Sequence, residues 1–466
     1  MGVGRRRFLI GGAAAVVAFD PIGLRWVAHA TPGAIAVPGL DGELVTDPAA
    51  LAEAAEDYGQ IVHTSPRAVL RPGSVRDIAT MVRFAGKHGI RVAVRGQGHS
   101  TFGQAQSPGV VIDSRPLSSV TISGSTAVVE AGALWGAVID AALPFGLMPP
   151  VMTDYVGLSV GGTLSVGGVG GAAQHHGLQV DTVRELEVVT GTGDLVRCRP
   201  GDRLFAAVLG GLGQYGLIVR ARVDLVPAPA SARVYKVTYT RLADLTTAQR
   251  TAVRDGRFSY VEGQVAPTDT GWSYIFEAAA YHDTPPDDTA LLSGLPAGTV
   301  EITDMPLHAW LNRITAVIDQ IRPLKFQNPW VNLFLPDHTT DTFVAETLST
   351  LTPAEVGGGP ILLYPVQRKR LTRPMVRVPG TDLVFLLSIL RALPADEPTV
   401  EALLADNRAI HDRAIALGAT QYPIGSIPVT RTDWRRHYGP RWPQALADKT
   451  TYDPRGILTP GQGVFG

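Results

Sequence analysis

The chain reads Arg95-Gly96-Gln97-Gly98-His99-Ser100 directly after a predicted strand, Arg91–Val94. The two glycines let backbone N–H groups approach an anionic ligand closely, and Arg95 adds positive charge. His99 places an imidazole ring at the edge of this turn. Together these features indicate a dinucleotide bound through its pyrophosphate, with a histidine near its reactive ring. The alternative is a glycine-rich turn whose histidine bonds only a backbone carbonyl.

The length and the charge balance limit the class of protein. At 466 residues the chain can bury a large core and is expected to form two domains. Its 41 basic and 42 acidic residues give a formal net charge of -1, so no overall field favours binding to nucleic acid. No internal stretch resembles a membrane span of ~20 apolar residues. We therefore expect neither a nucleic-acid partner nor stable membrane insertion of the mature chain.

The N-terminus has the pattern of an export signal. Basic residues in Gly4-Arg5-Arg6-Arg7-Phe8-Leu9 precede a short apolar run, Ile10–Phe19, and a small-residue cleavage site, Ala28-His29-Ala30. This pattern predicts a twin-arginine signal peptide over residues 1–30 and a secreted or extracytoplasmic protein that begins near Thr31. The twin-arginine route exports folded proteins, which agrees with a ligand bound before export. The alternative is a buried N-terminal helix or an uncleaved anchor.

Metal sites are not predicted for this chain. The single cysteine, Cys198, excludes an intrachain disulfide and a cysteine-based metal site, and we expect it to be a buried, inert thiol. Adjacent His175 and His176 resemble a metal pair, but neighbouring side chains diverge and no carboxylate cluster accompanies them. Packing or a contact with a ligand edge is the favoured interpretation of these histidines.

The first part of the chain predicts a compact β-α-β unit. Pro66–Pro72 has the pattern of a strand, Ser74 can cap a helix over Val75–His88, and Ile90–Val94 is the next strand. The elements expected after this unit are strands at Val110–Ile112, Val120–Ile122 and Ala127–Glu130, a helix at Ala133–Leu143, and a hairpin of Val183–Thr190 with Leu195–Arg199. Between them, Val156–Gly177 is too rich in glycine for a regular helix and implies close backbone approach to a ligand or a neighbour.

One motif matches the glycine pattern of a nicotinamide-dinucleotide-binding site. The chain reads Gly211-Leu212-Gly213-Gln214-Tyr215-Gly216, and the pattern G-x-G-x-x-G needs a strand before it and a helix after it. Here Asp202–Leu209 is predicted to be a helix and Leu217–Leu225 a strand, so the order is reversed. We therefore exclude a Rossmann site and interpret these glycines as a tight helix-to-strand turn.

The amino-acid composition of the sequence changes near residue 228. After Pro227-Ala228-Pro229-Ala230, glycine becomes sparser and charged and aromatic residues become denser until about residue 435. The tail Tyr452–Gln462 is again punctuated by glycine and proline. These changes predict a first domain over 31–228, a substrate domain over 229–435, and a C-terminal segment, 436–466, that returns to the first domain.

An ordered set of short motifs carries a resemblance to a known family. They are Arg95–Ser100 with Gly103-Gln104, Thr153-Asp154-Tyr155 before Val160–Ser165, His176-Gly177 with Val188–Gly191, Leu209–Gly216, Pro329–Asn332, and Tyr452-Asp453-Pro454 through Pro460-Gly461-Gln462. In this order, from about residue 60 to the C-terminus, the chain resembles the vanillyl-alcohol-oxidase-type flavoproteins and most closely the cytokinin dehydrogenases. The resemblance implies an α+β, two-domain PCMH-type FAD-binding fold whose second, cap domain is α+β and covers the flavin.

The resemblance also implies which residues hold FAD. It implies a covalent bond from the imidazole of His99 to the flavin 8α-methyl carbon. No cysteine lies in Val151–Gly171, so a second, cysteinyl bond is not expected. The residues implied at the pyrophosphate are Arg95, Gly96, Gln97, Gly98, Ser100 and Gln104. Those implied along the ADP and flavin are Ser159, Ser165, Val169 and Ile218, with Thr459 and Gln462 from the C-terminal segment.

Asp154 matches the acid–base residue of the family. Oxidation of an amine or alcohol by flavin needs a group that removes a proton from the substrate heteroatom. The sequence neighbours Val151, Met152, Tyr155 and Val156 are mostly apolar, so we expect an apolar setting for this carboxyl. The alternative is an aspartate that caps a turn.

The substrate is less well defined than the chemistry. Plant cytokinin dehydrogenases carry a glutamate pair on a helix over the site, where this chain has Val317 and Ile318 in a helix predicted over Ala309–Asp319. An apolar pair cannot hydrogen-bond a purine edge. The hypotheses are oxidation of an N6-alkenyl adenine, oxidation of another alcohol, sugar or amine, and a flavin-binding protein without turnover. Oxygen or a quinone is the expected electron acceptor.

Overall fold

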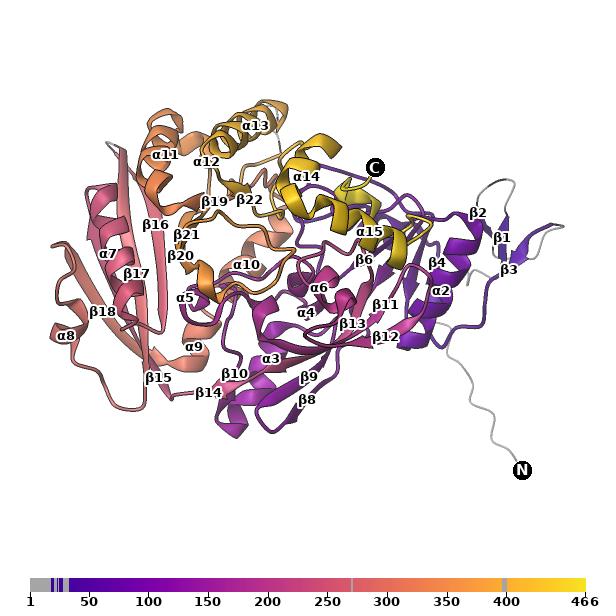
Figure 1. Ribbon diagram of the computed structural model, residues 1–466, viewed down its shortest axis with the longest axis horizontal. Coiled ribbons are helices and arrows are strands. Elements are labelled where there is room, and N and C mark those ends of the chain that lie inside the picture. The colour runs from indigo at the N-terminus through magenta and orange to yellow at the C-terminus, as the bar shows by residue number, and fades with distance from the viewer. Residues whose placement is uncertain (1–17, 21–22, 24, 28–32, 270, 396–399) are drawn as a thin grey trace.

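A computed structural model describes residues 18–20, 23, 25–27, 33–269, 271–395 and 400–466. Figure 1 shows an eight-stranded sheet on the left and the smaller sheets built from residues 43–224 on the right. Helices and sheets are mixed in both parts, so the predicted α+β class is confirmed. The eight-stranded sheet begins at Ser231, close to the boundary predicted near residue 228.

The sheet that precedes the glycine-rich turn has four strands in the order β4-β5-β7-β6. Strands β5, β7 and β6 are parallel, and β4 pairs antiparallel with β5. Helix α2 follows β5 with the predicted bounds, buries Ile78, Met81 and Val82, and ends at Gly89 in a left-handed conformation with φ 65°. The bounds are β4 Glu43–Val45, α1 Pro48–Ala55, β5 Ala68–Arg71, α2 Val75–His88, β6 Val92–Arg95 and β7 Val110–Asp113.

A second, five-stranded antiparallel sheet completes the first part of the molecule, in the order β12-β11-β13-β9-β8. The predicted hairpin is confirmed as β11 and β12. Helix α6 precedes Gly211–Gly216 and strand β13 follows it, so the exclusion of a Rossmann order is confirmed as well. The bounds are β8 Val120–Ser123, β9 Thr126–Glu130, α3 Trp135–Ala142, β10 Leu147–Met148, α5 Ala173–His176, β11 Val183–Val189, β12 Leu195–Cys198, α6 Arg203–Val208, β13 Leu217–Asp224 and β14 Val226–Pro227.

The glycine-rich region contains a short helix that the sequence did not predict. Helix α4 covers Val160–Leu164, including two glycines. A Cβ at Gly161 would lie 2.7 Å from the Cβ of Ala131, so glycine is required where α4 meets β9 and its following turn. The predicted close backbone approach is therefore confirmed, and the expectation of no regular helix is wrong for these five residues and for the four residues of α5, Ala173–His176.

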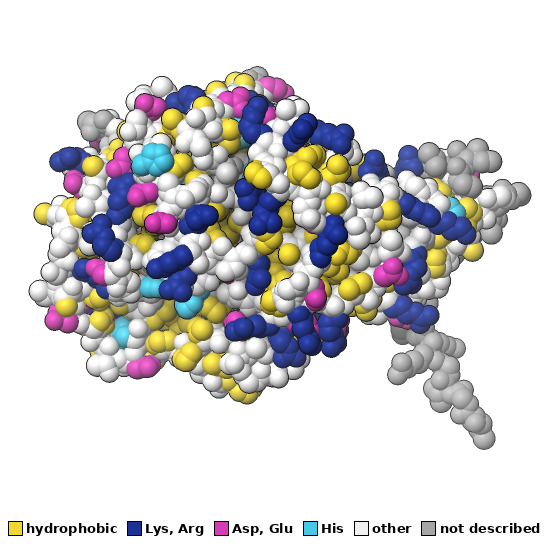
Figure 2. Space-filling model, viewed as in Figure 1, with side chains coloured by type: hydrophobic (Ala, Val, Ile, Leu, Met, Phe, Trp, Pro, Cys, Tyr) yellow, Lys and Arg dark blue, Asp and Glu magenta, His cyan; other side chains and the backbone are white. Residues whose placement is uncertain are grey.

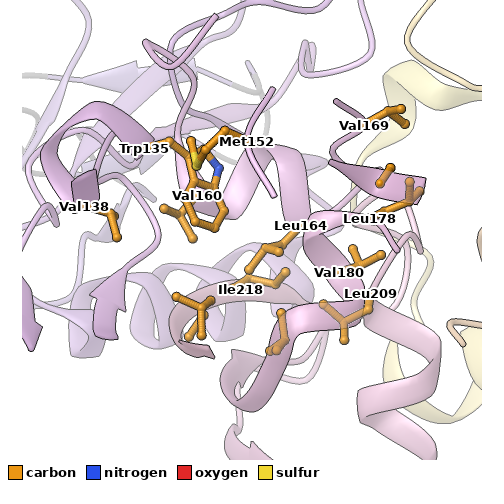
Figure 3. Close-up of a cluster of buried hydrophobic side chains, with 14 of the residues drawn as sticks. Trp135, Val138, Met152, Val160, Leu164, Val169, Leu178, Val180, Leu209 and Ile218 are labelled. Atoms are coloured by element: carbon orange, nitrogen blue, oxygen red, sulfur yellow. The ribbon is translucent and has the colours of Figure 1, made fainter. Parts of the chain in front are cut away.

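A buried apolar cluster fixes α4 against the five-stranded sheet. Figure 3 shows Trp135, Val160, Leu164 and Ile218 gathered between α3, α4 and β13. The indole N–H of Trp135 donates a hydrogen bond of 2.7 Å to Thr163 Oγ1, so its polar atom is satisfied in the core. This cluster fixes the position of α4, which is part of the glycine-rich region.

The eight-stranded sheet has two different faces. On one face α7, α11 and α13 contact the strands and share an apolar core with them. The other face is directed to the first part of the molecule. The order is β18-β15-β17-β16-β20-β21-β19-β22. The bounds are β15 Ser231–Tyr239, α7 Leu242–Asp255, β16 Tyr260–Thr268, β17 Gly271–His282, α8 Asp288–Leu292, β18 Thr299–Pro306, β19 Val331–Pro336, α11 Asp337–Thr350, α12 Pro353–Val356, β20 Ile361–Gln367, β21 Leu383–Ile389, α13 Val400–Ala416 and β22 Thr420–Gln421.

The helix predicted over Ala309–Asp319 is wrong as a single element. The structure has α9 at Leu307–Leu311 and α10 at Thr315–Ile321, with a turn between them. The side-chain amide of Asn312 donates a hydrogen bond of 3.0 Å to the carbonyl oxygen of His308, which competes with continuation of the helix. The break directs Arg313 into the interior.

The C-terminal segment lies beside the first sheet. Helices α14 at Arg431–Tyr438 and α15 at Trp442–Tyr452 precede it. Val92 in β6 donates its N–H to the carbonyl of Ile457 at 2.9 Å and accepts from the N–H of Thr459 at 2.8 Å. These bonds bring Thr459 next to the glycine-rich turn.

The predicted export signal lies mostly outside the described residues. Strands β1 at Ala18–Asp20 and β2 at Arg25–Val27 form a small sheet with β3 at Ile35–Ala36. Phe19 and Trp26 pack on Phe84 of α2. No helix in the described ranges is long and apolar enough to cross a membrane. Cleavage of an export signal stays a prediction. Mass spectrometry of the mature protein tests it by identifying the N-terminal residue. An N-terminus near Thr31 supports cleavage of the predicted signal, and a mature chain that retains Phe19 contradicts it.

Candidate active site

A cavity of about 860 Å³ lies between the first part of the molecule and the inner face of the eight-stranded sheet. Thirteen of the fourteen residues predicted for the site line it, which brings together segments more than 350 residues apart. They are Gly96, Gln97, Gly98, His99, Ser100, Gln104, Asp154, Ser159, Ser165, Val169, Ile218, Thr459 and Gln462.

Arg95 is the exception among the predicted residues. Its guanidinium lies behind the turn and donates to the backbone carbonyl of Glu56. Gly98 has φ 62°, and a Cβ there would lie 2.3 Å from Nη2 of Arg95. Arg95 is therefore packed under the turn and not on the cavity wall, so its effect in this geometry is on the shape of the turn.

Asp57, which the sequence interpretation did not include, holds the turn from the other side. Its carboxylate accepts hydrogen bonds from the N–H of Gly103 at 2.7 Å, the N–H of Gly59 at 3.0 Å and the hydroxyl of Ser100 at 3.1 Å. Burial raises the pKa of Asp57 to about 6, against the opposing effect of these donors. Asp57 thus orders the segment that carries Ser100 and Gln104.

The glycine-rich turn fits an anionic ligand. In the described part of the chain, the backbone N–H groups of residues 97–100 donate to no protein acceptor. A Cβ at Gly96 would lie 2.1 Å from Oγ of Ser159, so this position admits only glycine. Free N–H donors on a glycine-lined wall are what a pyrophosphate requires. The residues present therefore fit FAD.

His99 is placed as a neutral, aromatic wall of the cavity. Its ring stacks on Tyr58 at a centroid distance of 4.2 Å and meets Trp330 edge-on at 5.7 Å. Its Nδ1 atom is buried without a hydrogen-bond partner. Burial, with a smaller effect of the Arg322 charge, lowers the pKa of His99 to about 3. The imidazole therefore keeps an unprotonated nitrogen available to a bound group.

Asp154 accepts hydrogen bonds from three side chains of the second part. Its Oδ1 accepts from Tyr260 Oη at 2.6 Å and from Arg313 Nη2 at 2.7 Å, and its Oδ2 accepts from the hydroxyl of Tyr364. The expected apolar setting is wrong, because the spatial neighbours of this carboxyl are polar although its sequence neighbours are not. A carboxylate with these donors is held in one orientation at the cavity wall.

Arg313 connects Asp154 to two buried glutamates. Its guanidinium lies 3.5 Å from Glu277 and 3.8 Å from Glu262, and it stacks at 3.8 Å over the ring of Trp310. Burial, together with the charges of Asp154 and Glu277, raises the pKa of Glu262 well above its usual range. Glu262 bonds the same Tyr260 hydroxyl as Asp154.

Several predicted side chains lie away from this network. Nε2 of His175 lies 2.7 Å from the carbonyl oxygen of Phe258, and among the described residues no group of His, Cys, Asp and Glu is arranged to hold a metal. Cys198 is buried as predicted, and burial raises the pKa of its thiol to about 12, which favours the unreactive thiol form. Trp310, in contrast, belongs to the network, because Arg313 stacks on it; it lines the cavity and is 1% exposed.

Two family descriptions match the chain. "FAD binding domain" matches residues 66–199, and "Cytokinin dehydrogenase 1, FAD and cytokinin binding" matches residues 274–465. Among curated proteins, an uncharacterized oxidoreductase of the fasciation locus of Rhodococcoides fascians is 36% identical over 91% of this chain and 99% of that protein. Cytokinin dehydrogenase 7 of Oryza sativa subsp. japonica is 35% identical over 94% of each chain.

Solved structures agree with the fold. The 6-hydroxy-D-nicotine oxidase of Arthrobacter nicotinovorans superposes with a TM-score of 0.70 at 21% identity, covering 91% of this chain and 98% of that one. A chitooligosaccharide oxidase superposes with a TM-score of 0.70 at 17% identity, covering 88% and 94%. With the FAD-binding turn, the cavity and the extent of the sequence matches, the chain belongs to the cytokinin dehydrogenase family of FAD-dependent oxidoreductases.

Proposed function

We propose that this protein oxidises the side chain of an N6-alkenyl adenine, with Asp154 as the base. The observation that carries the proposal is the Asp154 carboxylate, fixed by three donors on the wall of a cavity that His99 also lines. The match of residues 274–465 to an FAD- and cytokinin-binding family supports the substrate class.

Asp154 has the capacity to accept the substrate proton. A carboxylate offers about four lone-pair positions, and the donors Tyr260, Arg313 and Tyr364 occupy three of them. One position is left for an N–H of the substrate. Arg313 Nη2 lies 2.7 Å from Oδ1 of Asp154 and helps to hold the carboxylate in one orientation. When bound, FAD accepts the hydride that leaves the substrate carbon.

The substrate proposal is tested by mixing the flavin-loaded protein with isopentenyladenine without oxygen and following the visible absorption of the flavin. We expect rapid bleaching, because hydride transfer converts oxidised flavin to its colourless reduced form. A protein that stays yellow with isopentenyladenine, but bleaches with an alcohol or a sugar, contradicts the proposed substrate and retains the redox chemistry.

Replacement of Asp154 by Asn tests its role. We expect Asp154→Asn to bind flavin normally and to reduce it at least about 100-fold more slowly with substrate, because general base catalysis contributes 10²–10⁴-fold. Stopped-flow absorption measures this rate. Asp382→Asn, at an exposed position outside the cavity, is the matched control. A wild-type rate in Asp154→Asn contradicts the assignment.

We further propose that His99 forms the single covalent bond to the flavin. Its orphan Nδ1 and its position on the cavity wall support this. We expect the flavin of the wild-type protein to remain with the polypeptide after acid precipitation, and the flavin of His99→Ala to be released. His63→Ala, at an exposed histidine, is the control. Release of flavin from both wild type and His99→Ala contradicts the bond.

The pH dependence of flavin attachment gives a second test of His99. Because burial lowers the pKa of its imidazole to about 3, the neutral form dominates at both pH 7 and pH 5. Apoprotein incubated with FAD should therefore form the covalent adduct at similar rates at both values. An imidazole with the ordinary pKa of about 6.5 would be only about 3% neutral at pH 5, and attachment would slow about 30-fold relative to the fully neutral form. Such a loss would contradict the neutral imidazole.

A further inference from the structure

A row of charged side chains crosses the inner face of the eight-stranded sheet. The strand register places Glu301 of β18 opposite Lys236 of β15, Lys236 opposite Glu277 of β17, and Glu277 opposite Glu262 of β16. Directly opposed residues in antiparallel strands share one face of a sheet. All four residues line the cavity, and β18 is the edge strand of the sheet. The row therefore leads from the outer edge of the sheet to the network around Asp154.

The two inner residues of the row, Glu262 and Glu277, bond to other protein side chains. The side chains of Glu262 and Glu277 are each 3% exposed. Glu262 bonds Tyr260, and Glu277 pairs with Arg313 at 3.5 Å and with Lys236 at 3.1 Å. These groups fix the base and have little capacity left for a substrate.

The outer half of the row retains free hydrogen-bonding capacity. The ammonium of Lys236 has three donors, of which Glu277 takes one, and its side chain is 49% exposed. Glu301 is exposed and makes no ion pair with another described residue. An acceptor carboxylate and a donor ammonium thus stand next to each other at the outer end of the cavity.

Helix α10 contributes an apolar surface to the same cavity. Ile314 in the turn before it and Ile318 and Ile321 within it line the cavity, whereas Val317 is 52% exposed and is not part of the lining. The acid that follows, Asp319, bonds the hydroxyl of Tyr155 at 3.3 Å. The isoleucines offer no hydrogen bond to a ligand, so a heterocycle beside them needs polar partners from another wall.

We propose that Lys236 and Glu301 recognise the polar edge of the substrate heterocycle, while the isoleucines of α10 pack on its face. Lys236 donates to a ring nitrogen, and Glu301 accepts from a ring or exocyclic N–H. A ligand that lacks the matching donor or acceptor would lose two hydrogen bonds to charged groups, and such losses discriminate between ligands. This inference rests on the proposed function and assigns its specificity to the sheet edge instead of the helix.

Steady-state kinetics of Glu301→Gln and Lys236→Met with isopentenyladenine test the inference. We expect KM to rise about tenfold or more in each variant, the size typical of a lost hydrogen bond to a charged group, with kcat within about threefold of wild type. Glu301→Gln is the cleaner variant, because it leaves the Lys236–Glu277 pair intact. Glu346→Gln and Lys369→Met, at exposed positions outside the cavity, are the matched controls and should retain the wild-type KM.

The outcomes separate this inference from the proposed function. A wild-type protein that is reduced by isopentenyladenine, with unchanged KM in both variants, overturns the recognition edge and keeps the proposed function. A large loss of kcat at unchanged KM also overturns it, because the residues would then act in the chemistry. A wild-type protein that isopentenyladenine does not reduce overturns the proposed function and the inference with it.

Discussion

The ion pair between Arg313 and Asp154 is the interaction on which the arrangement of the site depends. Both side chains are mostly buried, at 17% and 16% exposure, and they come from different parts of the molecule. Removing one partner of a buried pair typically costs about 3–5 kcal/mol, because the other charge is left without compensation. The pair therefore joins the loop that carries Asp154 to the turn between α9 and α10. The break between α9 and α10 places Arg313 for this contact.

The same pair also compensates part of the negative charge that the cavity contains. Four carboxyl groups, those of Asp154, Glu262, Glu277 and Glu301, face one cavity. Arg313 and Lys236 compensate two of them by direct contact, and burial raises the pKa of Glu262 well above its usual range. Figure 2 shows Lys and Arg scattered among Asp and Glu over one face of the molecule.

Sequence reasoning located the parts of the site that are encoded locally. The β-α-β unit, the bounds of α2 and the reversed order around Gly211–Gly216 follow from periodicity, caps and turn residues over short windows. The family motifs then placed thirteen residues on one cavity. The partners of Asp154 could not be found in this way. Tyr260, Arg313 and Tyr364 lie 106, 159 and 210 residues from it in sequence, and no motif joins them.

The errors of the sequence interpretation have the same physical origin. The apolar neighbours of Asp154 in sequence indicated an apolar setting, but tertiary contacts supplied a cation and two phenols instead. Arg95 was assigned to the pyrophosphate, whereas in the structure its guanidinium lies behind the turn and donates to the carbonyl of Glu56. For both Asp154 and Arg95, the surroundings of the charged group are set by residues that are remote in sequence. Around the charged row, the carboxyl groups of Asp154, Glu262, Glu277 and Glu301 outnumber the cations of Lys236 and Arg313, which disfavours an anionic substrate at this part of the cavity. A neutral heterocyclic amine meets that constraint, because it brings N–H donors to carboxylates without adding a like charge.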